Sequence, residues 1–163
     1  MHRNDACTMD IYTKLEKLNL DPSRQKYIKL YLLDCCEGFL KFRSSGKLEK
    51  NLDIARKFIE GSATNEEIHR AVWSMEAEAF GAECYSSKER YSVHKVDESI
   101  RKDLVKIRLS LRLANLESRK YLVDLAYFID SVFSYVEHSS NIGLLKNKSK
   151  FMCSKLFNKY FGD

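Results

Sequence analysis

The amino-acid sequence predicts an all-α fold, a single domain of six or seven helices packed mostly antiparallel as a multi-helix bundle. Apolar side chains recur with helical spacing along almost the whole chain, and sustained strand-like alternation is absent. One proline and six glycines in 163 residues are few for the turn-rich sandwiches and barrels. A chain of this length can bury one ordinary core, so we expect residues 1–163 to form one domain.

The first three helices are predicted from apolar spacing and from signals at their ends. Asp21 and Pro22 mark the start of the second helix, because aspartate caps free amide groups and proline at the first helical position loses no hydrogen bond. Gly61 ends the third, since glycine adopts the left-handed conformation without a side-chain clash. The predicted spans are 10–18, 22–43 and 48–60.

The fourth helix has the clearest start, a capping box formed by Thr64 and Glu67. It carries two apolar stripes, which predict a central helix that is contacted from two sides. One stripe contains Ile68, Val72, Met75 and Ala79, and the other contains Trp73, Ala77, Phe80 and Cys84. A flexible connection is expected at residues 85–92. The predicted spans of this helix and the three that remain are 64–84, 96–113, 117–136 and 149–160.

The helical stripes also predict which side chains form the core. The residues expected to be buried are Leu32, Ile68, Val72, Trp73, Met75, Leu104, Leu122, Leu125, Ile129 and Val132. Cys84 and one or both of Cys35 and Cys36 are expected to act as small core hydrophobes.

Charge is distributed unevenly along the chain, whose net charge is +5. Residues 60–84 contain one arginine and six glutamates, whereas the flanking parts, 1–59 and 85–163, are both basic. One interpretation is that each helix simply has a solvated face. The other is that the acidic helix binds a basic partner protein, because opposite charge steers such complexes together. The expected contact residues are Glu66, Glu67, Glu76 and Glu78.

Nucleic-acid binding through the basic second half is the competing function. Its expected contacts lie on the helix predicted at 96–113, and lysines also enrich the tail. No helix-turn-helix or zinc-finger pattern accompanies them. The residues proposed for this contact are Lys102, Lys106, Arg108 and Arg112.

Signatures of catalysis and of metal or cofactor binding are absent from the sequence, so we expect neither an enzyme nor a cofactor. No phosphate-binding loop, nucleophile elbow or zinc-ligand spacing occurs. Asp34 and Glu37 share one helix face, where pairing with Lys41 and other nearby basic residues is expected. An odd number of cysteines and the lack of an apolar leader or membrane-length run predict a cytoplasmic protein. The sequence leaves open whether the protein forms a homodimer.

One stretch resembles a bacterial all-helical family of immunity proteins. Residues 32–40 resemble the Leu-Asp-Cys-Ala-Glu segment of that family, and 55–61, 62–67 and the alanine-bearing helix that follows resemble its next parts in the same order. The match covers about residues 30–84; beyond residue 85, bulky side chains replace the family's alanine-rich packing. The resemblance implies a small cytoplasmic bacterial protein that neutralises a toxin domain, without catalytic residues.

Overall fold

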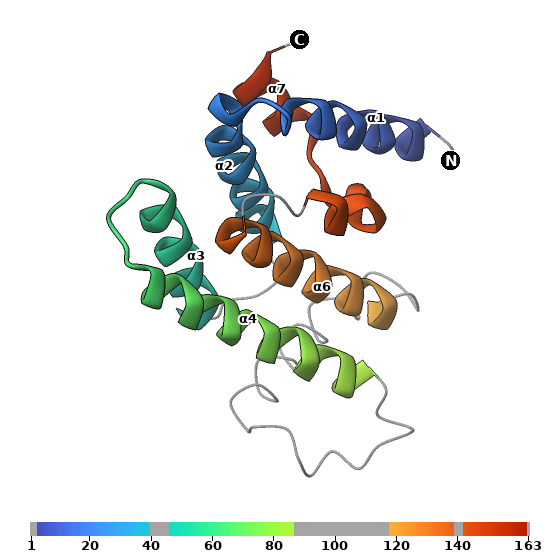
Figure 1. Cartoon of the computed structure of the whole chain (residues 1–163). Helices are drawn as coiled ribbons and strands as arrows, with labels where there is room; N and C mark the ends of the chain where they lie inside the picture. Colours follow the sequence, from blue (N-terminus) through green and yellow to red (C-terminus); the bar gives the residue numbers. More distant parts are fainter. Residues whose placement is uncertain (1–2, 40–45, 87–117, 139–141, 163) are drawn as a thin grey trace.

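The computed structural model describes residues 3–39, 46–86, 118–138 and 142–162, and the side chains of 11–38, 47–81, 123–138 and 142–162. Every regular element in these ranges is a helix, which confirms the predicted all-α fold (Figure 1). In chain order they are α1 (Arg3–Leu18), α2 (Pro22–Phe39), α3 (Gly46–Ile59), α4 (Asn65–Ser86), α6 (Ser118–Glu137), the 3₁₀ helix η3 (Ile142–Phe151) and α7 (Ser154–Phe161).

The three predicted helix-end signals are confirmed. The Asp21 carboxylate accepts hydrogen bonds from the Ser23 backbone amide at 3.0 Å and from the Ser23 hydroxyl at 2.7 Å. At the start of α4 the Thr64 amide donates to Glu67 Oε2 at 2.7 Å, and the Glu67 amide donates to Thr64 Oγ1 at 3.1 Å. Gly61 has a φ of 83°, the left-handed conformation expected after α3.

Among the described helices α6, and not α4 as predicted, packs most extensively against its neighbours. α6 packs against α2, α3, α4 and η3, and it buries Phe128, Val132 and Phe133 completely. α4 packs chiefly against α6 and α3 (Figure 1). It runs antiparallel to α6, since His69 near its start contacts Glu137 at the end of α6. One long side of α4 therefore stays free of both helices.

Most of the predicted core is confirmed. The side chains that are buried as expected are Leu32, Ile68, Val72, Met75, Leu125, Ile129 and Val132. Trp73 was expected there and is instead 64% exposed. Leu104 and the Leu122 side chain lie outside the described residues.

Several helix boundaries differ from the prediction. α1 begins at Arg3, seven residues early, because its first two turns lack the apolar spacing on which the prediction depended. The tail is divided into η3 and α7, separated by Met152 and Cys153, and η3 already includes Ile142 and Gly143. Three predicted segments lie outside the described residues: 40–43 at the end of the second helix, 87–92 of the expected connection and the basic helix at 96–113. Residues 85–86, which were expected in that connection, belong to α4.

Candidate docking surface on α4 and α6

Two large aromatic side chains of α4 face solvent. Trp73 is 64% exposed and Phe80 is 65% exposed. They lie seven residues apart, which is two helical turns, on one side of the helix, and exposed Ala77 lies between them. Their predicted burial in a second contact face is wrong because α3 and α6 both pack against the other apolar stripe. The Cys84 side chain lies outside the described residues.

A chain of two hydrogen bonds holds Trp73 in place. Its indole Nε1–H donates to His69 Nε2 at 2.9 Å, and His69 Nδ1 lies 2.7 Å from Glu137 Oε1. An indole nitrogen can only donate, so Nε2 is the acceptor and the neutral imidazole carries its proton on Nδ1, facing the carboxylate. The two rings meet edge to face with centroids 5.9 Å apart. An exposed tryptophan is thus anchored to a second helix.

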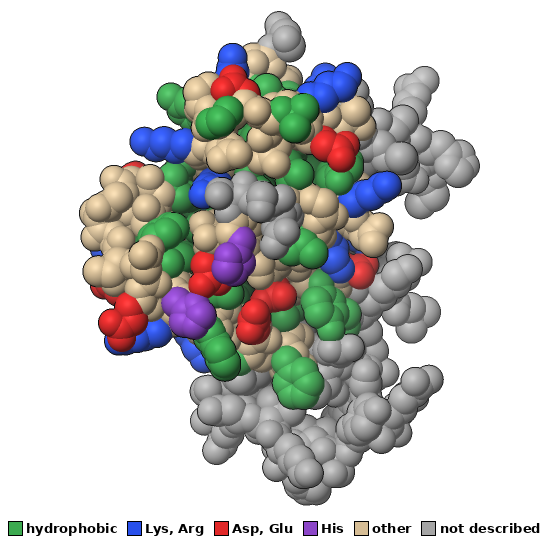
Figure 2. Space-filling model, viewed as in Figure 1, with side chains coloured by type: hydrophobic (Ala, Val, Ile, Leu, Met, Phe, Trp, Pro, Cys, Tyr) green, Lys and Arg blue, Asp and Glu red, His purple; other side chains and the backbone are tan. Residues whose placement is uncertain are grey.

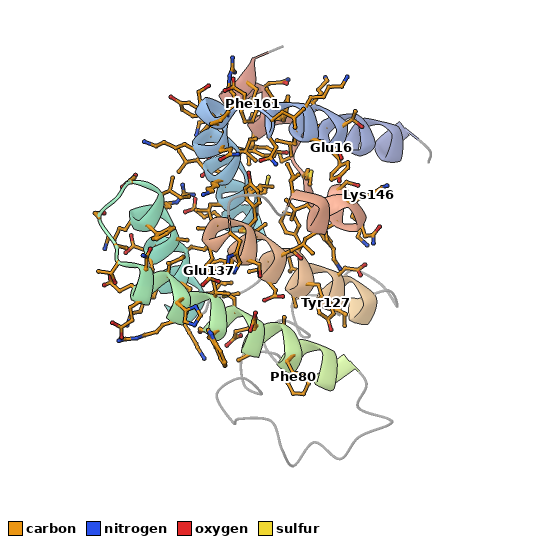
Figure 3. All side chains as sticks on the ribbon, viewed as in Figure 1. Glu16, Phe80, Tyr127, Glu137, Lys146 and Phe161 are labelled. Carbon is orange, nitrogen blue, oxygen red and sulfur yellow. The ribbon has the colours of Figure 1, made fainter. Side chains whose placement is uncertain are left out.

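Glu137 is the fixed end of this chain. Its side chain is 17% exposed, and its other carboxylate oxygen lies 3.3 Å from Nε2 of His138. Figure 3 shows Glu137 at the end of α6 above the first turns of α4. In Figure 2 the two histidine side chains lie on the same face as acidic and hydrophobic side chains of these helices.

A second pair of acidic residues on the same two helices interacts electrostatically. Asp130 of α6 is half-buried, and its Oδ1 atom is buried without a hydrogen-bond partner. Burial, reinforced by repulsion from the exposed Glu76 carboxylate of α4, raises the pKa of Asp130 to about 6. Their positions follow from the antiparallel packing of the two helices. Glu76 lies seven residues after His69 on α4, and Asp130 lies seven residues before Glu137 on α6. We call the surface formed by His69, Trp73, Glu76, Phe80, Asp130 and Glu137 the α4–α6 face.

The four glutamates expected to contact a partner occupy different environments. Glu76 belongs to the α4–α6 face. Glu66 is exposed and forms an ion pair with Arg70, while Glu67 is exposed and completes the capping box. Glu78 is 4% exposed because α3 packs over that side of α4, with Lys47 Nζ 3.5 Å from its carboxylate, and this burial does not favour contact with a partner.

A second polar cluster joins α2, α3 and α7. Asp34 and Glu37 share a face as predicted, and both pair with the Arg56 guanidinium of α3, at 2.5 and 2.9 Å. The Tyr160 hydroxyl of α7 also donates to Asp34 at 2.5 Å. Although burial opposes it, the hydrogen bonds from Tyr160 and Arg56 together with nearby positive charge lower the pKa of Asp34. The expected partner Lys41 lies outside the described residues. This cluster is an internal clamp between helices.

The remaining candidate residues are described only in part. Cys35 and Cys36 are buried as predicted, and burial raises the pKa of both thiols, that of Cys35 to about 12. No group of three metal-ligating side chains occurs among the residues the structure describes. None of the described helices is long and apolar enough to cross a bilayer. The residues proposed for nucleic-acid contact, Lys102, Lys106, Arg108 and Arg112, all lie outside the described ranges.

Sequence reasoning missed the roles of His69 and Glu137. A histidine four residues before a tryptophan on one helix was the available signal, because side chains with that spacing meet. The bond to Glu137 has no local signal, since it joins residues 68 positions apart.

His69 and Glu137 resemble part of a catalytic arrangement. A histidine next to a carboxylate is half of a nucleophile-activating triad, but the nitrogen that would accept the nucleophile's proton already accepts the Trp73 indole proton.

No family model matches the chain, and no curated protein or solved structure matches it significantly.

Proposed function

We propose that this chain is a non-catalytic protein-binding module that docks its partner on the α4–α6 face. The observation that carries the proposal is the exposure of Trp73 and Phe80 two turns apart on one helix. The other large apolar side chains exposed in the described ranges lie apart from α4, at Leu20 in the turn after α1, Tyr27 in α2 and Leu144 in η3. Tryptophan is the residue type most enriched at the energetic centres of protein interfaces.

The hydrogen-bond chain through His69 supports this role. Ordering a large side chain during association costs free energy, and a side chain that is already held in one orientation avoids much of that cost. Trp73 is held through His69 by Glu137, which is itself largely buried. A tryptophan that is exposed without contacting a partner would not need to be held in one orientation.

An immunity-like or antitoxin-like role in the bacterial cytoplasm is the specific form that we propose. The resemblance of residues 30–84 and the acidic charge of residues 60–84 support it, because a toxin that acts on nucleic acid carries a basic groove. The buried thiols Cys35 and Cys36, which are both free, fit a reducing compartment.

Affinity capture with matched variants tests the proposal. Three proteins would be immobilised and exposed to host lysate: the unsubstituted chain, a Trp73→Ala/Phe80→Ala double variant and a Leu144→Ala control. Mass spectrometry would identify the proteins that each one binds. Leu144 is also an exposed apolar side chain, 49% exposed, but it belongs to η3. We expect a protein that the whole chain and the control retain and the double variant loses.

A parallel nucleic-acid assay separates the competing function. Binding to DNA and RNA would be measured over a range of salt concentrations, because contacts with phosphates weaken steeply as salt increases. No captured protein, together with a strongly salt-dependent affinity for nucleic acid that the double variant keeps, would overturn the proposal.

A further inference from the structure

We propose that the occupant of the α4–α6 face is a basic amphipathic helix of the partner protein, with its apolar side chains on Trp73 and Phe80 and a lysine or arginine beside Glu76. The inference rests on the proposed function and adds the chemistry of the partner to it. The face combines two features that such a helix carries together, an apolar stripe and charge of the opposite sign.

The spacing of the aromatic side chains favours a helical occupant. Trp73 and Phe80 are seven residues apart on α4, and a rise of 1.5 Å per residue places them about 10.5 Å apart along the helix axis. A helix that lies alongside α4 repeats its own apolar residues at the same distance, every seven positions, so two contacts form at once. Between the aromatic rings, Ala77 leaves room for the backbone of the occupant to approach.

The carboxylates favour a basic occupant. Glu76 is exposed on the same side of α4 as Trp73 and Phe80, and after burial its negative charge is the second cause of the raised pKa of Asp130 on α6. An ammonium or guanidinium group beside the exposed Glu76 carboxylate offsets that repulsion. The same cation lies near the Trp73 side chain, whose ring face attracts positive charge. An anionic partner such as a nucleic acid would instead be repelled from this face.

Synthetic peptides test the inference directly. The probes are three peptides of about 18 residues, long enough to form a helix on binding, built from leucine with lysine, with glutamate or with glutamine and lacking tryptophan. Trp73 is the only tryptophan in the chain, so its fluorescence reports binding at this face, and calorimetry gives the affinity. The variants are Glu76→Gln, Asp130→Asn and Phe80→Ala. Glu16→Gln is the matched control, an exposed glutamate of α1 at the far side of the molecule (Figure 3).

We expect the leucine–lysine peptide to bind most tightly and the leucine–glutamate peptide most weakly. Each carboxylate variant should weaken binding of the basic peptide about fivefold, and Phe80→Ala about tenfold or more, with Glu16→Gln unchanged. Asp130→Asn is informative because it should stabilise the fold while it weakens binding. A general structural defect would change both in the same direction.

Three results would overturn the inference. In the first, Glu76→Gln and Asp130→Asn bind the basic peptide as tightly as Glu16→Gln does. In the second, the acidic or neutral peptide binds as well as the basic one. In the third, the whole chain dimerises in solution and Phe80→Ala makes it monomeric, which would make a second copy the occupant. If lysate capture still depends on Trp73 and Phe80, the proposed function stands and only the basic helix is wrong.

Discussion

Replacing Asp130 by asparagine should stabilise the protein at neutral pH and leave its stability unchanged in acid. The pKa of Asp130 is about 6 in the fold, against an ordinary value of 3.8. The folded chain therefore binds this proton more tightly than the unfolded chain does. The favourable contribution of the protonated carboxyl group is complete below pH 3.8 and is lost as the pH rises through 6. Asparagine resembles the protonated side chain at every pH, so the variant avoids that loss.

The size of the effect follows from the shift in pKa. A difference of about two pH units corresponds to at most about 3 kcal/mol. Asp130 is only half-buried, and solvent screens part of its interaction, so we expect a gain of about 1–2 kcal/mol at pH 7–8. Glu76→Gln should give a smaller gain, because it removes the repulsion and leaves burial, the larger cause of the shift, in place.

Urea unfolding followed by circular dichroism, repeated between pH 4 and 8, measures this prediction. Asp124→Asn is the matched control, since Asp124 lies on the same helix but forms an ion pair with Lys150. The control should lose a little stability at neutral pH where Asp130→Asn gains. A gain for Asp130→Asn that does not change with pH, or a loss at pH 7, would refute the argument that its ionised form is strained in the fold.

Three further predictions concern other contacts. His69→Ala removes the acceptor of the indole proton, so Trp73 should become more mobile, seen as lower fluorescence anisotropy, with weaker partner binding and little change in stability. Arg56→Met leaves Asp34 without its guanidinium and should cost about 2 kcal/mol at pH 7 in urea unfolding. That cost should shrink in acid, because the lowered pKa of Asp34 makes its contribution present above pH 3.8 and lost as the pH falls further. Thr64→Ala removes half of the capping box and should cost about 1 kcal/mol in the same measurement.

Local patterns in the sequence predicted the helices well, for a physical reason. Helix starts and ends depend on side chains a few residues apart, and those contacts occur at Asp21, Gly61 and Thr64 as expected. The core-facing stripe of α4 was also predictable, because apolar residues at helical spacing must be buried somewhere. The start of α1 was missed because its first two turns carry no such stripe.

The composition of the α4–α6 face was not predictable, because it depends on which helices pack where. Two apolar stripes on α4 suggested two contact faces, but α3 and α6 both lie against one of them, which leaves Trp73 and Phe80 exposed. The same packing buries Glu78, a residue type that is rarely buried. The Arg56 guanidinium donates to Asp34 across 22 residues of sequence, and the spacing of side chains along one helix cannot predict such a contact.

The α4–α6 face destabilises the isolated protein, because several unfavourable features lie together on it. Trp73 and Phe80 leave large apolar areas in water, and burial together with the charge of Glu76 disfavours the ionised form of Asp130. An amide at position 130 and polar side chains at positions 73 and 80 would make a more stable monomer. The chain instead fixes Trp73 in place through His69 and Glu137, which makes its exposure a defined feature of the structure. A basic, apolar partner would cover the two aromatic side chains and offset the repulsion from Glu76 when it binds, so features that weaken the free protein would stabilise the complex.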